Sequence, residues 1–152
     1  MSMRGLSFIL SVLISALLAG CDSKLPAITD CMASGDITPI CGLKNPEDIE
    51  VLQDQKSLLI SQMGNMEGTK SGNLVVYDTE SGDVYPLFPR VGVDTGRPDW
   101  GDKNCTGMPG NDFAPHGISL RKRDDGQLQL AVINHGGRET VEMFSVQHQD
   151  SR

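Results

Sequence analysis

The sequence has little positive charge, few aromatic side chains and no apolar segment long enough to span a bilayer comfortably. Its 13 Lys and Arg stand against 20 Asp and Glu, a net charge of −7, and this acidic balance argues against a nucleic-acid partner. The apolar run at residues 6–18 is short for a transmembrane helix. What the chain does contain is many glycines and prolines for its length, which favours a turn-rich all-β domain.

Residues 1–21 have the pattern of a targeting segment, with Arg4 supplying the positive start. Residues 18–21, Leu-Ala-Gly-Cys, resemble the lipobox of bacterial lipoproteins. A cleaved signal peptide or a membrane anchor is the alternative, but a cysteine directly after Leu-Ala-Gly favours the lipoprotein. We therefore expect Cys21 to carry lipid and to anchor the protein in the bacterial cell envelope, on the periplasmic face. Asp22 resembles an inner-membrane retention signal and points to that membrane.

Lipidation of Cys21 leaves Cys31, Cys41 and Cys105 in a compartment where disulfides persist. Because three is an odd number, one of these cysteines is either free or separated from its partner. The odd count is a first indication that the chain is part of a longer protein.

Residues 22–40 are expected to form a tether and lead-in, and residues 41–152 the folded domain. Its first part shows four short alternating segments, which predict one up-and-down antiparallel sheet. The expected strands are residues 49–52, 58–61, 73–78 and 83–88. A long connection rich in Gly, Pro and Asp follows at residues 89–112, and connections of this length are usually functional or disordered. Three further strands are expected between residues 113 and 147.

Two histidines occur at the outer ends of the first two of these later strands. A two-residue type I′ turn at Asp125-Gly126 would align Asp124 with Gln127 and, further out, His116 with His135. Directly opposed residues lie on one face with Cβ atoms roughly 4.5–5.5 Å apart, so the imidazoles should be neighbours. The same alignment opposes two aliphatic pairs, Ile118 with Ile133 and Leu120 with Ala131. We therefore expect the histidine face to be the apolar, inward one.

The strand pattern occurs twice along the chain. Residues 46–51 match residues 115–120 at a proline, an isoleucine and a final aliphatic residue. Two more pairs of segments match in the same order, 58–61 with 130–134 and 74–77 with 141–144. Repeated four-stranded units of about 40 or more residues are typical of a β-propeller. The repeat thus predicts one blade at about 46–88 and an incomplete second at about 115–147.

In a propeller the first strand of each blade lines the central channel, where equivalent positions face one another. Glu47 and His116 are equivalent, so a carboxylate and an imidazole should meet at one mouth of the channel. A ring needs roughly 4–8 blades to remove its sheet edges. We therefore expect this chain to be the N-terminal fragment of a monomeric propeller rather than one subunit of an assembled ring.

Three motifs together resemble the paraoxonase/arylesterase family. They are Cys41 followed by residues 47–51, residues 115–119 around His116, and residues 132–135 leading to residues 140–144. The resemblance covers about residues 41 to 146. It implies a six-bladed β-propeller that hydrolyses esters and lactones with calcium, and it implies that most of the calcium ligands come from later blades that this fragment lacks. Two alternatives remain open: a non-catalytic propeller lipoprotein for binding or assembly, and a gluconolactonase-like propeller hydrolase.

The resemblance also implies roles for individual residues. Glu47 is similar to a ligand of the catalytic calcium, and Asp48 to a ligand of a structural calcium to which Ile118 adds a backbone carbonyl. His116 is similar to the general base that takes a proton from water, and His135 to the residue that orients it or relays its proton.

The resemblance further implies that Cys41 pairs with a cysteine near the end of the complete protein. Cys31 and Cys105 would then be able to pair with each other, a point that the sequence leaves open.

Overall fold

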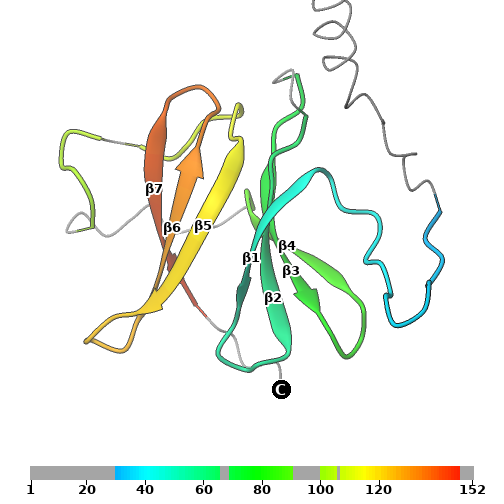
Figure 1. The fold of residues 1–152 in the computed structure, drawn as a ribbon. Coiled ribbons are helices and arrows are strands. Elements are labelled where there is room, and N and C mark those ends of the chain that lie inside the picture. The colour runs from blue at the N-terminus through cyan, green and yellow to red at the C-terminus, as the bar shows by residue number, and fades with distance from the viewer. Residues whose placement is uncertain (1–29, 66–68, 91–99, 106, 148–152) are drawn as a thin grey trace, which may run out of the picture. The chain divides into compact units, whose positions relative to one another are not determined.

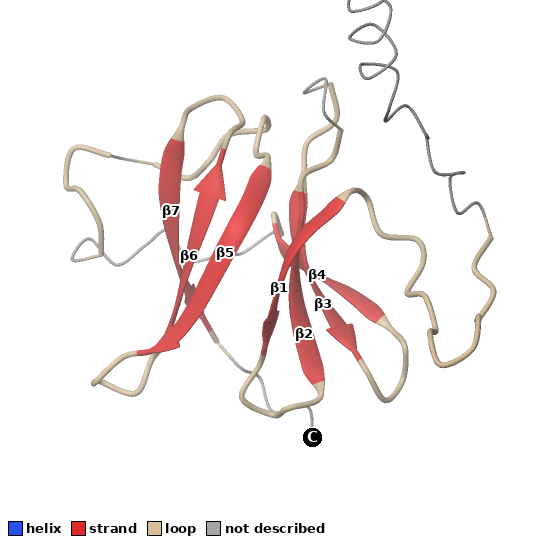
Figure 2. Cartoon of the chain, in the orientation of Figure 1, coloured by secondary structure: helices blue, strands red, loops and turns tan. Residues whose placement is uncertain are grey.

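The computed structural model describes residues 30–65, 69–90, 100–105 and 107–147. The chain divides into two compact units, residues 1–41 and 42–152. The described residues form seven β-strands and no helix, which confirms the all-β class (Figure 1, Figure 2). Accordingly, none of the described residues belongs to a helix that could cross a membrane. The expected targeting segment at residues 1–21 lies outside the described residues.

In the first unit, a disulfide joins Cys31 to Cys41, whose Cα atoms are 6.2 Å apart. A tight turn between them brings the two cysteines together, because Ser34 and Ile37 exchange both backbone hydrogen bonds, at 3.0 and 3.1 Å. The expectation that Cys41 pairs with a distant cysteine is therefore wrong, as is a Cys31 pairing with Cys105. Cys105 is free and exposed.

This pairing predicts a simple labelling pattern. Trypsin cleavage at Lys24 and Lys44 releases both paired cysteines in one peptide, residues 25–44, and Cys105 in residues 104–121. We expect a thiol reagent to label residues 104–121 in the unreduced protein, and residues 25–44 only after reduction. Mass spectrometry of the digest checks this, and labelling of residues 25–44 without reduction would contradict the disulfide.

The first sheet contains four antiparallel strands in chain order, as the alternating pattern predicted. They are β1 (Pro46–Val51), β2 (Ser57–Gln62), β3 (Asn73–Asp78) and β4 (Val84–Phe88). The β3–β4 turn closes on Asp78, whose carboxylate accepts the N–H groups of Glu80 and Ser81 at 2.8 and 2.9 Å. These two hydrogen bonds lower the pKa of the Asp78 carboxyl.

The second sheet contains the three strands expected near the end of the chain. They are β5 (Pro115–Lys122), β6 (Leu128–Asn134) and β7 (Thr140–Val146), antiparallel and in chain order. Both sheets thus follow the order that the sequence repeat predicted. In both, the pairing of the first two strands is irregular just after the initial proline, between Pro46 and Asp48 in β1 and between Pro115 and Ile118 in β5.

The β5–β6 hairpin does not have the predicted two-residue turn. Arg123 donates its N–H to the carbonyl of Gln127 at 2.8 Å, which leaves three residues in the loop. The last of these, Gly126, has φ +82°, a conformation that glycine adopts without the strain that a Cβ brings. Such three-residue loops are a common hairpin connection, and the extra residue shifts the strand pairing by one.

The shifted register changes which aliphatic residues meet. Ile118 pairs with Val132 and Leu120 with Leu130, so the predicted pairs Ile118 with Ile133 and Leu120 with Ala131 are wrong. Val132 and Leu130 are fully buried, whereas Ile133 is 43% exposed. The buried face of β6 is therefore the opposite one from that predicted.

The main core lies between the two sheets. Leu59, Leu74 and Phe88 of the first sheet belong to one buried cluster with Leu130 and Val132 of the second. Phe113, in the loop before β5, packs edge-on against Phe88 with ring centroids 5.1 Å apart, and Phe144 of β7 packs at 5.0 Å from Phe88. Three of the four phenylalanines of the chain are thus concentrated at this core.

Strands β1 and β5 are edge strands of different sheets and lie next to each other (Figure 1). Two acidic side chains of β1 connect them. Asp48 accepts the N–H of Ile118 at 2.8 Å, and Glu50 accepts the N–H of Leu120 at 2.9 Å. Because alternate N–H groups of an edge strand have no ladder partner, these carboxylates take the place of a neighbouring strand.

Candidate active site

His116 and His135 lie side by side, with ring centroids 5.5 Å apart and an interplanar angle of 69°. The predicted neighbourhood of the two imidazoles is therefore confirmed. Their side chains are 48% and 44% exposed, however, so the prediction that they face the apolar interior is wrong. The reason is the register shift of the hairpin together with the irregularity at the start of β5, which turn the histidines to the surface.

A carboxylate contacts the outer side of each imidazole. Glu47 Oε2 lies 3.3 Å from His116 Nε2, which confirms the meeting of carboxylate and imidazole that the repeat predicted. Glu139 Oε2 lies 2.7 Å from His135 Nδ1. The four side chains Glu47, His116, His135 and Glu139 thus form a row, which we call the histidine row.

Glu139 was missed in the sequence, although a signal for it exists. Asn134 pairs with Thr140 across the β6–β7 hairpin, so the next residues outward along the two strands are His135 and Glu139. Reading this second hairpin in register would have placed the two residues opposite each other.

Asn134 holds the backbone around the histidine row. It is fully buried, and its Oδ1 accepts the N–H groups of Ala114 at 2.9 Å and of Gly136 at 3.1 Å. Its Nδ2 donates to the carbonyls of Gly136 at 2.9 Å and Arg138 at 3.0 Å. Every hydrogen-bonding capacity of the amide is used, so Asn134 joins the segment that leads to His116 with the loop between His135 and Glu139.

Arg138 and Glu142 brace the same loop with two parallel hydrogen bonds, Nε to Oε1 at 3.0 Å and Nη2 to Oε2 at 3.1 Å. Glu142 is 8% exposed, and Thr140 Oγ1 also donates to its carboxylate at 2.6 Å. The hydrogen bond to Glu142 raises the pKa of the Arg138 guanidinium. Bidentate pairs of this kind fix geometry as well as charge, so the loop that carries His135 and Glu139 is held from both sides.

The row has the chemistry of a proton acceptor. A carboxylate bound at one imidazole nitrogen favours the tautomer with the proton on that nitrogen, so the other nitrogen keeps its lone pair. His135 has this arrangement, because Glu139 Oε2 lies at hydrogen-bond distance from its Nδ1. Glu47 Oε2 faces His116 Nε2 as an ion-pair partner at 3.3 Å. The lone pair of His135 therefore lies on Nε2, and a carboxylate lies beside each of the two imidazoles.

No family model and no curated protein matches this sequence. The function must therefore be inferred from the chemistry of the residues.

Among the described residues, the side chains expected to bind calcium have other partners. Asp48 already accepts the N–H groups of Ile49 and Ile118, both at 2.8 Å, and Ile118 thus turns its N–H rather than its carbonyl toward this carboxylate. Glu47 is engaged by His116. Within the described ranges no group of three or more His, Cys, Asp or Glu is placed to hold a metal, whereas calcium takes about 6–8 oxygen ligands.

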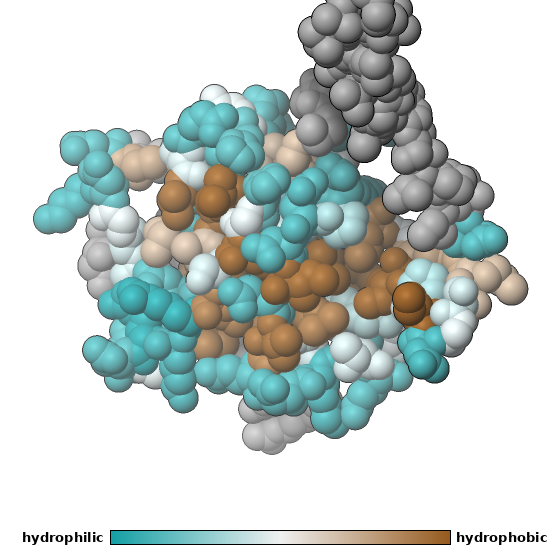
Figure 3. Space-filling model, in the orientation of Figure 1, coloured by the Kyte–Doolittle hydropathy of each residue, from teal (hydrophilic) through white to brown (hydrophobic). Residues whose placement is uncertain are grey.

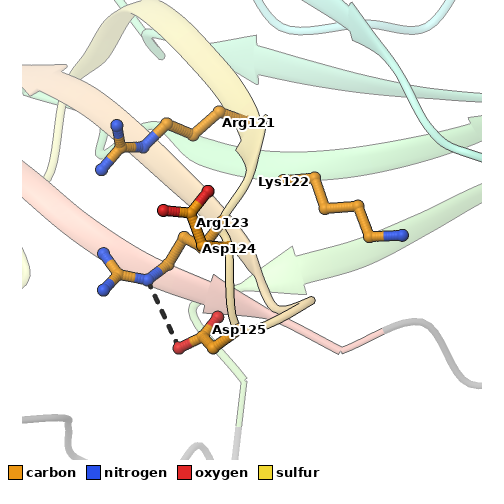
Figure 4. A pocket seen from close by; sticks show the side chains of 5 residues that line it. All are labelled: Arg121, Lys122, Arg123, Asp124 and Asp125. Atoms are coloured by element: carbon orange, nitrogen blue, oxygen red, sulfur yellow. Dashed lines mark ion pairs between the residues drawn. The ribbon is translucent and has the colours of Figure 1, made fainter.

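At the other end of β5, the β5–β6 hairpin forms a shallow charged hollow (Figure 4). Arg121 and Arg123 extend to the same side, and Lys122 extends the other way. The buried amide of Gln129 accepts from Arg121 at 2.7 Å, and Arg123 pairs with Asp125 at 3.6 Å. These arginines have partners within the hairpin, so the hollow is explained by local structure.

Apolar side chains reach the surface beside the histidine row. Ile133 lies two residues before His135 on the same face of β6, and Val141 is its partner on β7. They are 43% and 59% exposed. Ile49, two residues after Glu47 on β1, is 53% exposed. Figure 3 shows apolar residues gathered on the surface over the middle of the visible face.

Proposed function

We propose that this protein is a hydrolase of carboxylic esters and lactones that activates water at the histidine row. One observation carries the proposal: two imidazoles lie 5.5 Å apart at the surface, each with a carboxylate on its outer side. A general base of this kind contributes roughly 10²–10⁴-fold to the rate of a hydrolysis.

The reaction follows from the proton acceptor. His116 takes one proton from a water molecule while the water oxygen bonds to the carbonyl carbon, which gives a tetrahedral oxyanion and an imidazolium. The oxyanion then collapses, the bond to the alkoxy oxygen breaks, and the departing alkoxide takes the proton from the imidazolium. In a lactone the alkoxide stays attached to the new acid. Glu47 and Glu139 stabilise the positive charge on the row during this cycle.

The surroundings of the row support an apolar substrate. Ile133, Val141 and Ile49 offer hydrocarbon surface beside the imidazoles, which suits the alkyl or aryl part of an ester. The resemblance to the paraoxonase/arylesterase family agrees with this reaction class. We further propose that the two sheets are adjacent propeller blades, since their strand order repeats and their first strands lie next to each other. Calcium dependence and attachment through Cys21 to a membrane remain predictions from the sequence.

His116→Gln tests the reaction directly. In the full chain we expect the hydrolysis of phenyl acetate and of a γ-lactone to fall by about 10²–10⁴-fold, because the proton acceptor is removed. The melting temperature should change little, since a half-exposed side chain contributes little to stability. The matched control is His148→Gln, the same change at the third histidine, which lies outside the described residues.

Equal losses of activity in the two variants, or full activity in His116→Gln, would contradict the proposed role of His116. A wild-type chain without any hydrolytic activity would sink the proposed function and favour the non-catalytic binding lipoprotein.

A further inference from the structure

A second cavity lies between the end of β4 and the loop before β5. Its volume is about 400 Å³, within the range of small-molecule sites, and none of its lining residues belongs to the histidine row. Aromatic and other apolar side chains form most of the wall, and they are Phe88, Pro89, Met108, Pro109 and Phe113.

The walls of this cavity are held in place by the fold. Phe88 and Phe113 are 4% and 1% exposed and pack edge-on against each other. Gly72 donates its N–H to the carbonyl of Phe113 at 2.6 Å, and Ser71 donates its hydroxyl to the carbonyl of Asn111. The segment just before β3 and the loop before β5 are therefore tied together at the cavity wall.

The ionisable side chains that line the cavity indicate the charge of its ligand. Among the described residues that line it, Arg90 is the one ionisable side chain and none is an acid. This is unusual for a chain with a net charge of −7. An apolar cavity with one guanidinium favours a ligand that has an apolar body and a single anionic group, because guanidinium binds carboxylate through two parallel hydrogen bonds.

We propose that this cavity binds small monocarboxylates with an aromatic or short alkyl body. The body packs against Phe88, Phe113 and Met108, and the carboxylate pairs with Arg90. This goes beyond the proposed hydrolysis, although the acids released from apolar esters belong to the same chemical class. Binding here requires no catalysis, so the two proposals are tested separately.

Calorimetric titration of the full chain with phenylacetate tests the site, with the neutral phenylacetamide as the matched ligand. We expect saturable binding of phenylacetate, at least tenfold weaker binding in Arg90→Gln, and little change for phenylacetamide. Met108→Asp places a negative charge in the wall and should weaken phenylacetate binding further. Arg121→Gln, at the hairpin tip, is the control for loss of a surface arginine and should bind as the wild type does.

Absence of saturable binding, or equal binding by wild type and Arg90→Gln, would overturn the proposal. Loss of binding in His116→Gln with no change in Arg90→Gln would overturn it as well, because the carboxylate would then sit at the histidine row. Retained binding by His116→Gln alongside lost hydrolysis supports both proposals, and binding by a chain with no hydrolytic activity supports this one alone.

Discussion

Gly136→Ala is expected to abolish hydrolysis and to lower the free energy of unfolding by about 3 kcal/mol, at the upper end of the cost of overpacking. A Cβ at Gly136 would lie under 3.0 Å from the carbonyl oxygen of Asp112 and from the N–H nitrogen of Ala114. Ala114 cannot yield alone, because Asn134 binds its N–H together with both backbone groups of Gly136. The loop must therefore shift, and His135 shifts with it relative to His116.

The matched control is Gly110→Ala, in which the added Cβ meets nothing within 4 Å and the backbone needs no left-handed conformation. Urea unfolding and phenyl acetate hydrolysis measure the two effects. Gly110→Ala should unfold within about 0.5 kcal/mol of the wild type, as is usual for open surface positions. Equal stabilities for the two variants would show that the loop before β5 is not clamped at Gly136.

The seven strands could be predicted because alternation of apolar and polar residues is a local signal. The register of the β5–β6 hairpin could not. An Asp-Gly pair suits both a two-residue loop and the last positions of a three-residue loop, and the choice depends on which face of β6 packs against the first sheet. Burial of Leu130 and Val132 against Leu59 and Leu74 decides it, and that contact joins distant parts of the chain.

Only part of the histidine row could be predicted from the sequence. Glu47 and His116 follow from the repeat, since equivalent strands of neighbouring units adopt equivalent positions. His135 was placed beside His116 from a wrong register, and the irregular start of β5 restored the neighbourhood. The positions of Asn134 and Glu139 are set by the short β6–β7 loop. The role of Asn134 could not be predicted, because a buried asparagine that binds two separate segments leaves no local pattern in a sequence.

The hydrogen bonds of Asp48 give it a role besides the predicted one of calcium ligand, and the two roles can be tested together. A calcium ligand and a partner for backbone N–H groups stabilise the fold in different ways, because only the first role depends on the presence of the ion. The distances of 2.8 Å to the N–H groups of Ile49 and Ile118 support the second role. Glu50 repeats it at Leu120.

Combined Asp48→Ala and Glu50→Ala is expected to destabilise the protein by about 2–6 kcal/mol, since each of the two lost acceptors for a partly buried N–H costs roughly 1–3 kcal/mol. Urea unfolding without calcium measures this loss. The control is Glu80→Ala, which removes an exposed ion pair with Lys56 and should cost less than about 1 kcal/mol.

The same unfolding experiment in excess calcium separates the two roles of Asp48. A ligand present at 100 times its dissociation constant stabilises by about 2.7 kcal/mol. A calcium-dependent gain in the wild type that disappears in Asp48→Ala would establish Asp48 as a metal ligand. The hydrogen bonds to β5 predict instead that the variant loses its stability equally with and without the ion.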